Sequence, residues 1–152
     1  MDSYIQRSMT DVFREHLNTV YRLAYTFMGS RRDAEAAASM AFAKLMQSGE
    51  RNYDAEQERA WLIDAVIGAC YGMLSRDRED GGTRSEAPAD KALEAMVSLP
   101  GKYKAAAYLF FCEGLTAREI AAALGEDPGT VTTAVNKSRR LLKAKLGGDF
   151  DA

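Results

Sequence analysis

The chain has little cysteine, histidine and proline, and it lacks long apolar runs. Cys70 and Cys112 are isolated, and His16 is the single histidine, so no zinc ligand set can be assembled. We expect both thiols to be reduced core residues. The sequence contains no run of about 18 apolar residues, the length needed to span a bilayer. Its first residues also lack the basic segment followed by an apolar segment that marks a signal peptide. These absences predict a cytoplasmic protein with no membrane partner, no metal and no cofactor.

Enzyme motifs are also missing. The sequence contains no glycine-rich phosphate loop, no nucleophile elbow and no paired-carboxylate helix motif. His16 falls between apolar turns of an expected helix, where a lone histidine is more often a surface or satisfied core residue than a general base. We therefore expect no enzymatic activity and no small-molecule substrate.

Charge is unevenly distributed along the chain, although the formal net charge is only -2. Residues 1–99 hold 12 Lys and Arg against 16 Asp and Glu, whereas residues 100–147 hold 8 against 4. The net charge of the second segment is therefore +4, from 8 minus 4. A basic C-terminal third is typical of a segment that meets phosphates.

Apolar residues recur at spacings of three and four throughout, and no sustained alternation indicates a strand. The pattern predicts an all-α protein. In the first half it predicts helices at 11–27, with Phe13 on the apolar face, at 32–47 and at 56–76, which together form a three-helix bundle. Gly29 is expected to end the first helix in a left-handed conformation.

The stretch 76–91 contains adjacent glycines, a proline and no large apolar residue, which is the composition of a flexible tether. We therefore predict two small helical domains, with a three-helix domain at 1–79, a linker at 80–91 and a four-helix domain at 92–152. Helices of the second domain are expected at 92–98, 103–113, 116–124 and 129–146.

The last two of these helices have the spacing of a helix-turn-helix. Thr116 and Glu119 form a capping-box pattern at the start of the first, and residues 125–128 form the turn. Apolar positions of the second helix share one face, and its opposite face presents hydroxyls and an amide near the N-terminus and cations near the C-terminus. This arrangement suits a recognition helix in the major groove. We predict DNA contacts by Thr130, Thr132, Thr133, Asn136, Lys137, Arg139, Arg140 and Lys143.

The order of these parts resembles the extracytoplasmic-function group of bacterial alternative sigma factors. Leu99-Pro100, the scaffold helix within 113–125 and Gly129-Thr130-Val131 fit the C-terminal pattern of that family, and residues 20–24 fit its N-terminal one. The resemblance implies promoter DNA and core RNA polymerase as partners, with an anti-sigma protein as a candidate third. It places polymerase docking at Asp33, Glu35, Ser39, Met40 and Lys44.

Several positions depart from the family pattern. Ala36, Ser39 and Met40 stand where the family has polar residues, and the helix that melts promoters in the family here carries Gly68 and Gly72, which would permit close helix crossing. A degenerate sigma paralogue or a helix-turn-helix regulator that does not melt promoters is therefore an alternative function. A protein-interaction module whose two domains clamp together or onto a helical partner is a third.

Overall fold

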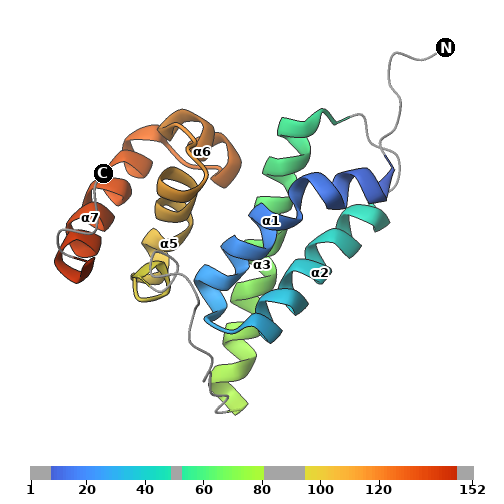
Figure 1. The fold of residues 1–152 in the computed structure, drawn as a ribbon, viewed down its shortest axis with the longest axis horizontal. Helices are drawn as coiled ribbons and strands as arrows, with labels where there is room; N and C mark the ends of the chain where they lie inside the picture. Colours follow the sequence, from blue (N-terminus) through green and yellow to red (C-terminus); the bar gives the residue numbers. More distant parts are fainter. Residues whose placement is uncertain (1–7, 49–52, 81–94, 147–152) are drawn as a thin grey trace.

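The structure is a computed structural model that describes residues 8–48, 53–80 and 95–146, with the backbone alone for 76–80. Every regular element in these ranges is helical, which confirms the all-α prediction. The N-terminal half contains α1 (Met9–Met28), α2 (Arg31–Gln47) and α3 (Ala55–Asp80). The C-terminal half contains α5 (Gly101–Ala107), the π-helix η1 (Tyr108–Cys112), α6 (Ala117–Leu124) and α7 (Pro128–Leu146) (Figure 1).

The junction between α1 and α2 is a tight turn. Gly29 ends α1 with φ 69°, a left-handed conformation that costs glycine nothing because it has no Cβ. Ser30 then begins α2, and its side chain accepts a hydrogen bond from the Asp33 backbone N–H at 3.3 Å. The predicted glycine end is confirmed, and it brings α2 back along α1.

Small side chains let the three N-terminal helices approach closely. Ala34, Ala37 and Ala41 of α2 are fully buried, and they meet Leu23 of α1 and Leu62 of α3 in one apolar core. One polar pair crosses this core: His16 Nε2 lies 3.1 Å from Glu58 Oε1, and both residues are buried. His16 is therefore a core residue whose ring is hydrogen-bonded, one of the two structural roles expected for it.

The C-terminal half differs from the prediction at its first long helix. In place of one α-helix over 103–113, α5 gives way at Tyr108 to five residues of π-helix. The wider turn ends at Gly114 with φ 72°, and the Leu115 N–H donates to the Leu109 carbonyl oxygen at 3.1 Å. For the helix predicted at 92–98, only the part from Ala95 onward lies within the described residues, and Ala95 to Val97 are helical.

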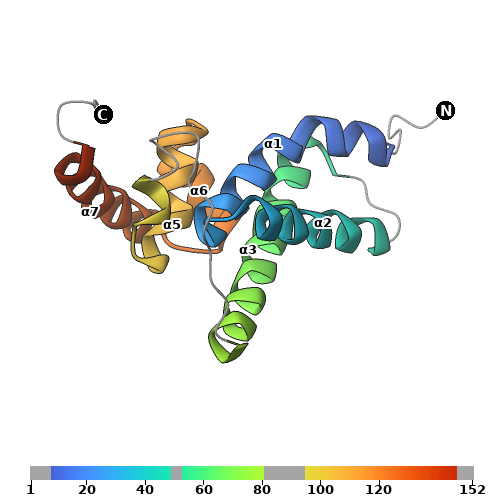
Figure 2. The ribbon, with the colours of Figure 1, turned by 60° about the horizontal axis from the view of Figure 1, so that its bottom comes forward.

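The two halves pack against each other. Ile120 and Ala121 of α6 and Leu109 of η1 belong to the same buried cluster as Leu23 and Leu62. α6 lies against α3, and α5 lies against α1 (Figures 1 and 2). A smaller cluster joins Leu142 of α7 and Ala107 of α5 to Ala95, Met96 and Leu99. Both views place α7 on the side of the molecule away from α2.

Three expectations for the N-terminal half are wrong. Phe13 is 45% exposed, because it lies at the open surface between α1 and α2, where its ring is 5.0 Å from that of Phe42 between centroids. α3 continues to Asp80, so residues 76–80 of the expected tether are helical, and the rest of the tether lies outside the described residues. Gly68 and Gly72 permit no close crossing, since a Cβ at either would meet nothing within 4 Å.

Candidate nucleic-acid interface

The helix before the turn, α6, begins and ends where the sequence predicts. Thr116 Oγ1 accepts from the Glu119 N–H at 3.1 Å, and Glu119 Oε1 accepts from the Thr116 N–H at 2.9 Å. The backbone bond from Thr116 holds the pKa of the Glu119 carboxyl below its usual value. Gly125 ends the helix with φ 67°. These local bonds set the direction in which the chain enters the turn.

The start of α7 is capped by a side chain that the motif analysis did not single out. Asp127 Oδ2 accepts from the Gly129 N–H at 3.0 Å and from the Thr130 N–H at 3.4 Å. Pro128 is the first helical residue, where its missing N–H costs no hydrogen bond. This cap could have been predicted from the sequence, because an aspartate directly before a proline is a common start of a helix.

One face of α7 is buried and the other is exposed, as predicted. Val131, Val135 and Leu142 are buried against α5 and α6, and buried Ser138 donates its hydroxyl to the Ala134 carbonyl oxygen at 2.8 Å. The opposite face is a continuous polar stripe, which we call the α7 polar face. Its exposed members are Thr130, Thr132, Thr133, Asn136, Lys137, Arg140 and Lys143.

The N-terminal part of the α7 polar face offers neutral hydrogen-bonding groups. Thr132 Oγ1 donates to the Pro128 carbonyl oxygen at 3.0 Å, so its lone pairs are directed outward as acceptors. Three cations follow on the same face, at Lys137, Arg140 and Lys143. Groups that can read base edges therefore come first along the helix, and groups that can meet phosphates come later.

Arg139 is placed differently from the other predicted contacts. It is half-buried, and its guanidinium carbon lies 5.9 Å from the Phe110 ring centroid and 5.6 Å from that of Phe111. Its Nη1 donates to Asn136 Oδ1 at 2.7 Å. Phe110 and Phe111 are both half-buried: they pack against the core and also form the surface on which this arginine lies.

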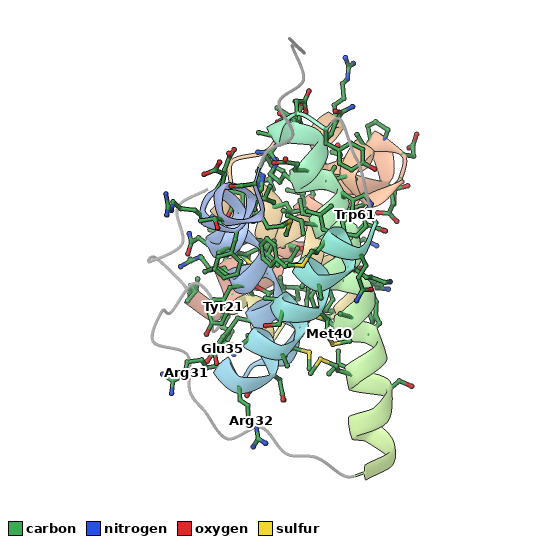
Figure 3. All side chains as sticks on the ribbon, turned by 90° about the vertical axis from the view of Figure 1, so that its right-hand side faces the viewer. Tyr21, Arg31, Arg32, Glu35, Met40 and Trp61 are labelled. Atoms are coloured by element: carbon green, nitrogen blue, oxygen red, sulfur yellow. The ribbon has the colours of Figure 1, made fainter. Side chains whose placement is uncertain are left out.

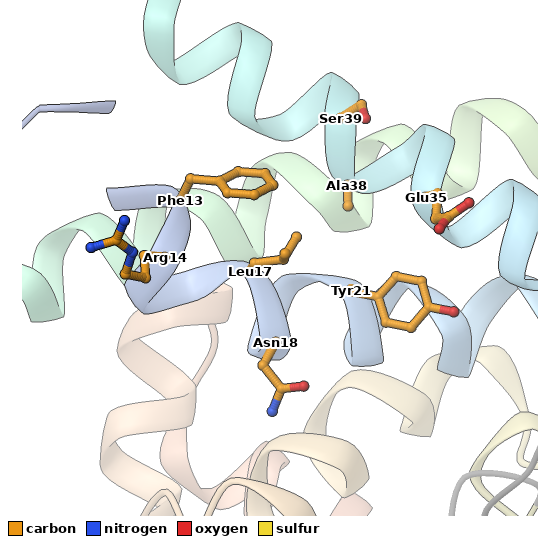
Figure 4. Close-up of a pocket in the computed structure, with 8 residues that line it drawn as sticks. All are labelled: Phe13, Arg14, Leu17, Asn18, Tyr21, Glu35, Ala38 and Ser39. Carbon is orange, nitrogen blue, oxygen red and sulfur yellow. The ribbon is translucent and has the colours of Figure 1, made fainter. Parts of the chain in front are cut away.

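The residues expected at the polymerase surface lie mainly on the outer side of α2. Glu35, Ser39, Met40 and Lys44 are exposed, whereas Asp33 is half-buried at the helix start. Figure 3 shows Glu35 and Met40 along α2, between α1 and α3. Beside them, a groove of about 700 Å³ runs between α1 and α2. Phe13, Leu17 and Tyr21 line one side of it, and Glu35, Ala38 and Ser39 line the other (Figure 4).

The helix that corresponds to promoter melting in the resemblance offers one exposed aromatic side chain among its described residues. Tyr71 is 50% exposed, and its ring meets Phe27 edge-on at 5.4 Å between centroids. Trp61 is half-buried near the other end of α3 (Figure 3). Tyr71 therefore packs on Phe27 and leaves half of its surface exposed to solvent.

Within the part of the chain that the structure describes, no three His, Cys, Asp or Glu side chains gather in a way that would hold a metal ion. No helix there is long and apolar enough to cross a bilayer.

Comparison with known families matches two separate segments of the chain. Residues 12–79 match Sigma-70 region 2, and residues 89–142 match Sigma-70, region 4. The first segment contains most of the N-terminal helices, and the second contains α5, η1, α6 and most of α7.

Individual proteins show the same similarity. The chain is 30% identical to "ECF RNA polymerase sigma factor SigE" of Mycolicibacterium smegmatis, over 95% of this chain and 64% of that protein. It is 24% identical to "RNA polymerase sigma factor SigV" of Bacillus subtilis, over 87% of each. The chain thus spans less than two thirds of the length of the first relative.

Solved structures share the fold. The sigma factor RpoE from Bartonella quintana, in a co-crystal with the anti-sigma factor NepR, matches 93% of this chain and 99% of its own with a TM-score of 0.71 at 22% identity. A chain from the complex of the anti-anti-sigma factor PhyR with NepR, from the same organism, matches 91% of this chain and 51% of its own, with a TM-score of 0.61 at 16% identity.

Proposed function

Because the chain belongs to the sigma-70 family, as a sigma factor of the extracytoplasmic-function group, we propose that it binds core RNA polymerase and directs it to a promoter. The α7 polar face carries this proposal, since a capped helix-turn-helix exposes base-reading groups and cations on one helix side. The protein acts by binding, without covalent chemistry of its own, in the cytoplasm where polymerase and promoters meet.

The proposed division of labour follows the predicted domains. Residues 1–79 dock on polymerase, residues 80–91 link the two parts, and residues 92–152 recognise DNA. On the first part, the exposed α2 side chains Glu35, Ser39, Met40 and Lys44 contact polymerase, with Asp33 at their edge. An anti-sigma protein is a proposed third partner, supported by the co-crystal of a structural relative with such an inhibitor.

The salt dependence of binding tests the DNA contacts. Fluorescence anisotropy of the full chain with a pool of random duplexes should show affinity falling steeply as salt rises, because cations on DNA release counterions. Arg140→Ala and Lys143→Ala should each reduce the slope of log K against log salt by about 1. Arg32→Ala, which removes an exposed arginine at the start of α2, is the matched control and should leave the slope unchanged. Binding without salt dependence would contradict the proposal.

Assembly with core polymerase tests the other half. Glu35→Lys and Lys44→Glu should weaken binding of the chain to core polymerase, whereas Glu126→Lys, in the turn before α7, should not. Strand opening on a promoter selected from a genomic library then separates the sigma function from its alternative. Core binding with opening supports the sigma function, core binding without opening supports a regulator that does not melt promoters, and no core binding excludes the sigma function.

A further inference from the structure

Arg139 and Asn136 form a hydrogen-bonded pair on the proposed recognition helix, α7. They are three residues apart, so their side chains lie on the same side of α7. The arginine Nη1 donates to the asparagine Oδ1 at 2.7 Å, a short bond strengthened by the guanidinium charge. The pair sits where the exposed face of α7 meets η1, because Arg139 is half-buried and Asn136 is exposed.

The Arg139 guanidinium packs against two aromatic rings of η1. Phe110 and Phe111 of η1 meet at 5.0 Å with an interplanar angle of 83°, and the Arg139 guanidinium lies over both. Its Nε is buried and has no hydrogen-bond partner among the described residues. The guanidinium plane is therefore located by the rings, and it directs one N–H toward Asn136.

This contact restricts what Asn136 can offer to DNA. An asparagine reads adenine with both ends of its amide, since Oδ1 accepts from the N6 amine while Nδ2 donates to N7. Here Oδ1 is turned toward Arg139, which already uses one of its two lone pairs, so the Nδ2 donors form the end of the amide that is left to face the ligand. Guanine offers these donors two acceptors, O6 and N7, and thymine offers O4, whereas the N7 acceptor of adenine lies beside an opposing amine and cytosine offers only an amine.

We propose that Arg139 is a positioning residue that holds Oδ1 of Asn136 on the side of η1 and presents its Nδ2 donors to DNA, so that the base facing Asn136 carries a keto oxygen. This inference rests on the proposed function, because it takes α7 as the DNA-reading helix. Arg139 acts through Asn136 and needs no DNA contact of its own.

The experiment compares base preference between variants of the full chain. Preferred sequences are first selected from a randomised duplex pool with the wild type and with Asn136→Ala. The position at which Asn136→Ala loses base preference is taken as the one that Asn136 reads. Affinities are then measured for duplexes that differ only at that position. The wild type should favour guanine or thymine there. Arg139→Met keeps an unbranched side chain over the rings but has no donor, so preference should shift toward adenine by about tenfold. Arg139→Lys retains a charged donor and should keep the keto preference.

A second variant makes the test independent of Arg139 folding effects. Asn136→Asp keeps an acceptor for Arg139 but has no amide donor, so the keto preference should be lost and cytosine, which offers an amine, should gain. A purely structural role of Arg139 would weaken all duplexes equally and leave the ratio between bases unchanged. An unchanged ratio between bases in Arg139→Met, with the helical circular dichroism of the variant intact, would overturn this inference but not the proposed function. Absence of salt-dependent binding by the wild type would instead overturn the proposed function, and this inference with it.

Discussion

Thr19 of α1 donates its hydroxyl to Glu113 Oε1, at 3.0 Å, across 94 residues of sequence. The other Glu113 oxygen accepts from the Tyr108 hydroxyl at 2.6 Å. Burial raises the pKa of Tyr108, the Glu113 bond and charge raise it further, and Arg22 opposes them. The phenol therefore stays protonated and donates. One carboxylate thus connects the first helix of the N-terminal half to the π-helix of the C-terminal half.

Removal of this carboxylate should destabilise the protein. Glu113→Ala leaves the Thr19 and Tyr108 hydroxyls without this acceptor, so the free energy of unfolding in urea should fall by about 1–3 kcal/mol. A double-mutant cycle with Thr19→Val should give a coupling energy of roughly 0.5 kcal/mol or more. Thr10→Val, at an exposed position of the same helix, is the control and should change stability by less than about 0.5 kcal/mol. Strict additivity of the two substitutions would show that the bond does not form.

The buried pair His16 and Glu58 should behave as a unit. Either His16→Leu or Glu58→Met leaves one polar group in a site where both residues are at most 4% exposed, and each should cost roughly 2–5 kcal/mol in urea unfolding. The double variant replaces both with apolar groups and should cost clearly less than the sum. Glu56→Met, an exposed change on the same helix, should be close to neutral. A double variant as unstable as the sum would indicate that the two side chains act separately.

The capping box of α6 should contribute to the stability of the helix-turn-helix. Thr116→Ala removes the side-chain acceptor of the Glu119 N–H, which should lower stability by about 1 kcal/mol. Thr116→Ser keeps the hydroxyl and should retain most of the wild-type stability. Amide hydrogen exchange in α6 reports the local effect, and equal exchange in both variants would argue against the cap.

The same box predicts a pH dependence. The folded pKa of Glu119 lies below its ordinary value of 4.5, so its stabilising contribution is present above that pH and is lost as the pH falls through the lower folded value. Glu119→Gln removes this titration and should flatten the stability profile below about pH 5. Glu126→Gln, in the following turn, serves as the matched variant. An acid profile unchanged by Glu119→Gln would be inconsistent with a charged bond to Thr116.

Cys70 should be chemically silent in the folded protein. Burial raises the pKa of its thiol from 9.0 to about 12, with Lys104 opposing the rise, so at pH 8 only about one thiol in ten thousand is the reactive thiolate. Iodoacetamide should spare Cys70 in the native chain and label it in urea, as measured by mass spectrometry. Half-buried Cys112 provides the internal comparison and should react faster. The contribution of the neutral thiol to stability is full below about pH 9 and declines toward pH 12. Fast native labelling of Cys70 would contradict its burial.

Some features of the fold and site could be predicted because neighbours in sequence determine them. The glycine end of α1, the capping box at Thr116 and the buried face of α7 rest on bonds and periodicity within a few residues. The exposed α7 polar face follows from the same periodicity. Local hydrogen bonds and the 3.6-residue repeat depend little on the rest of the chain, so the amino-acid sequence is sufficient to predict these features.

Other features depend on contacts that sequence spacing does not contain. The exposure of Phe13 depends on how α1 and α2 meet, and the open sides of Gly68 and Gly72 depend on which helices do not cross α3. The π-helix that places Phe110 and Phe111 under Arg139 is a further case. Periodicity tells which face of a helix is apolar, but not what covers it.

The sequence by itself therefore determined an all-α chain, the caps and turn of its helix-turn-helix, and the face of α7 that meets solvent. Tertiary structure alone decided that the two halves share one core, that the Thr19–Glu113 hydrogen bond joins them, and that Arg139 lies on the aromatic rings of η1. The physical reason is range: caps and helical faces arise from residues within one or two turns, whereas these contacts join residues brought together only when the helices pack.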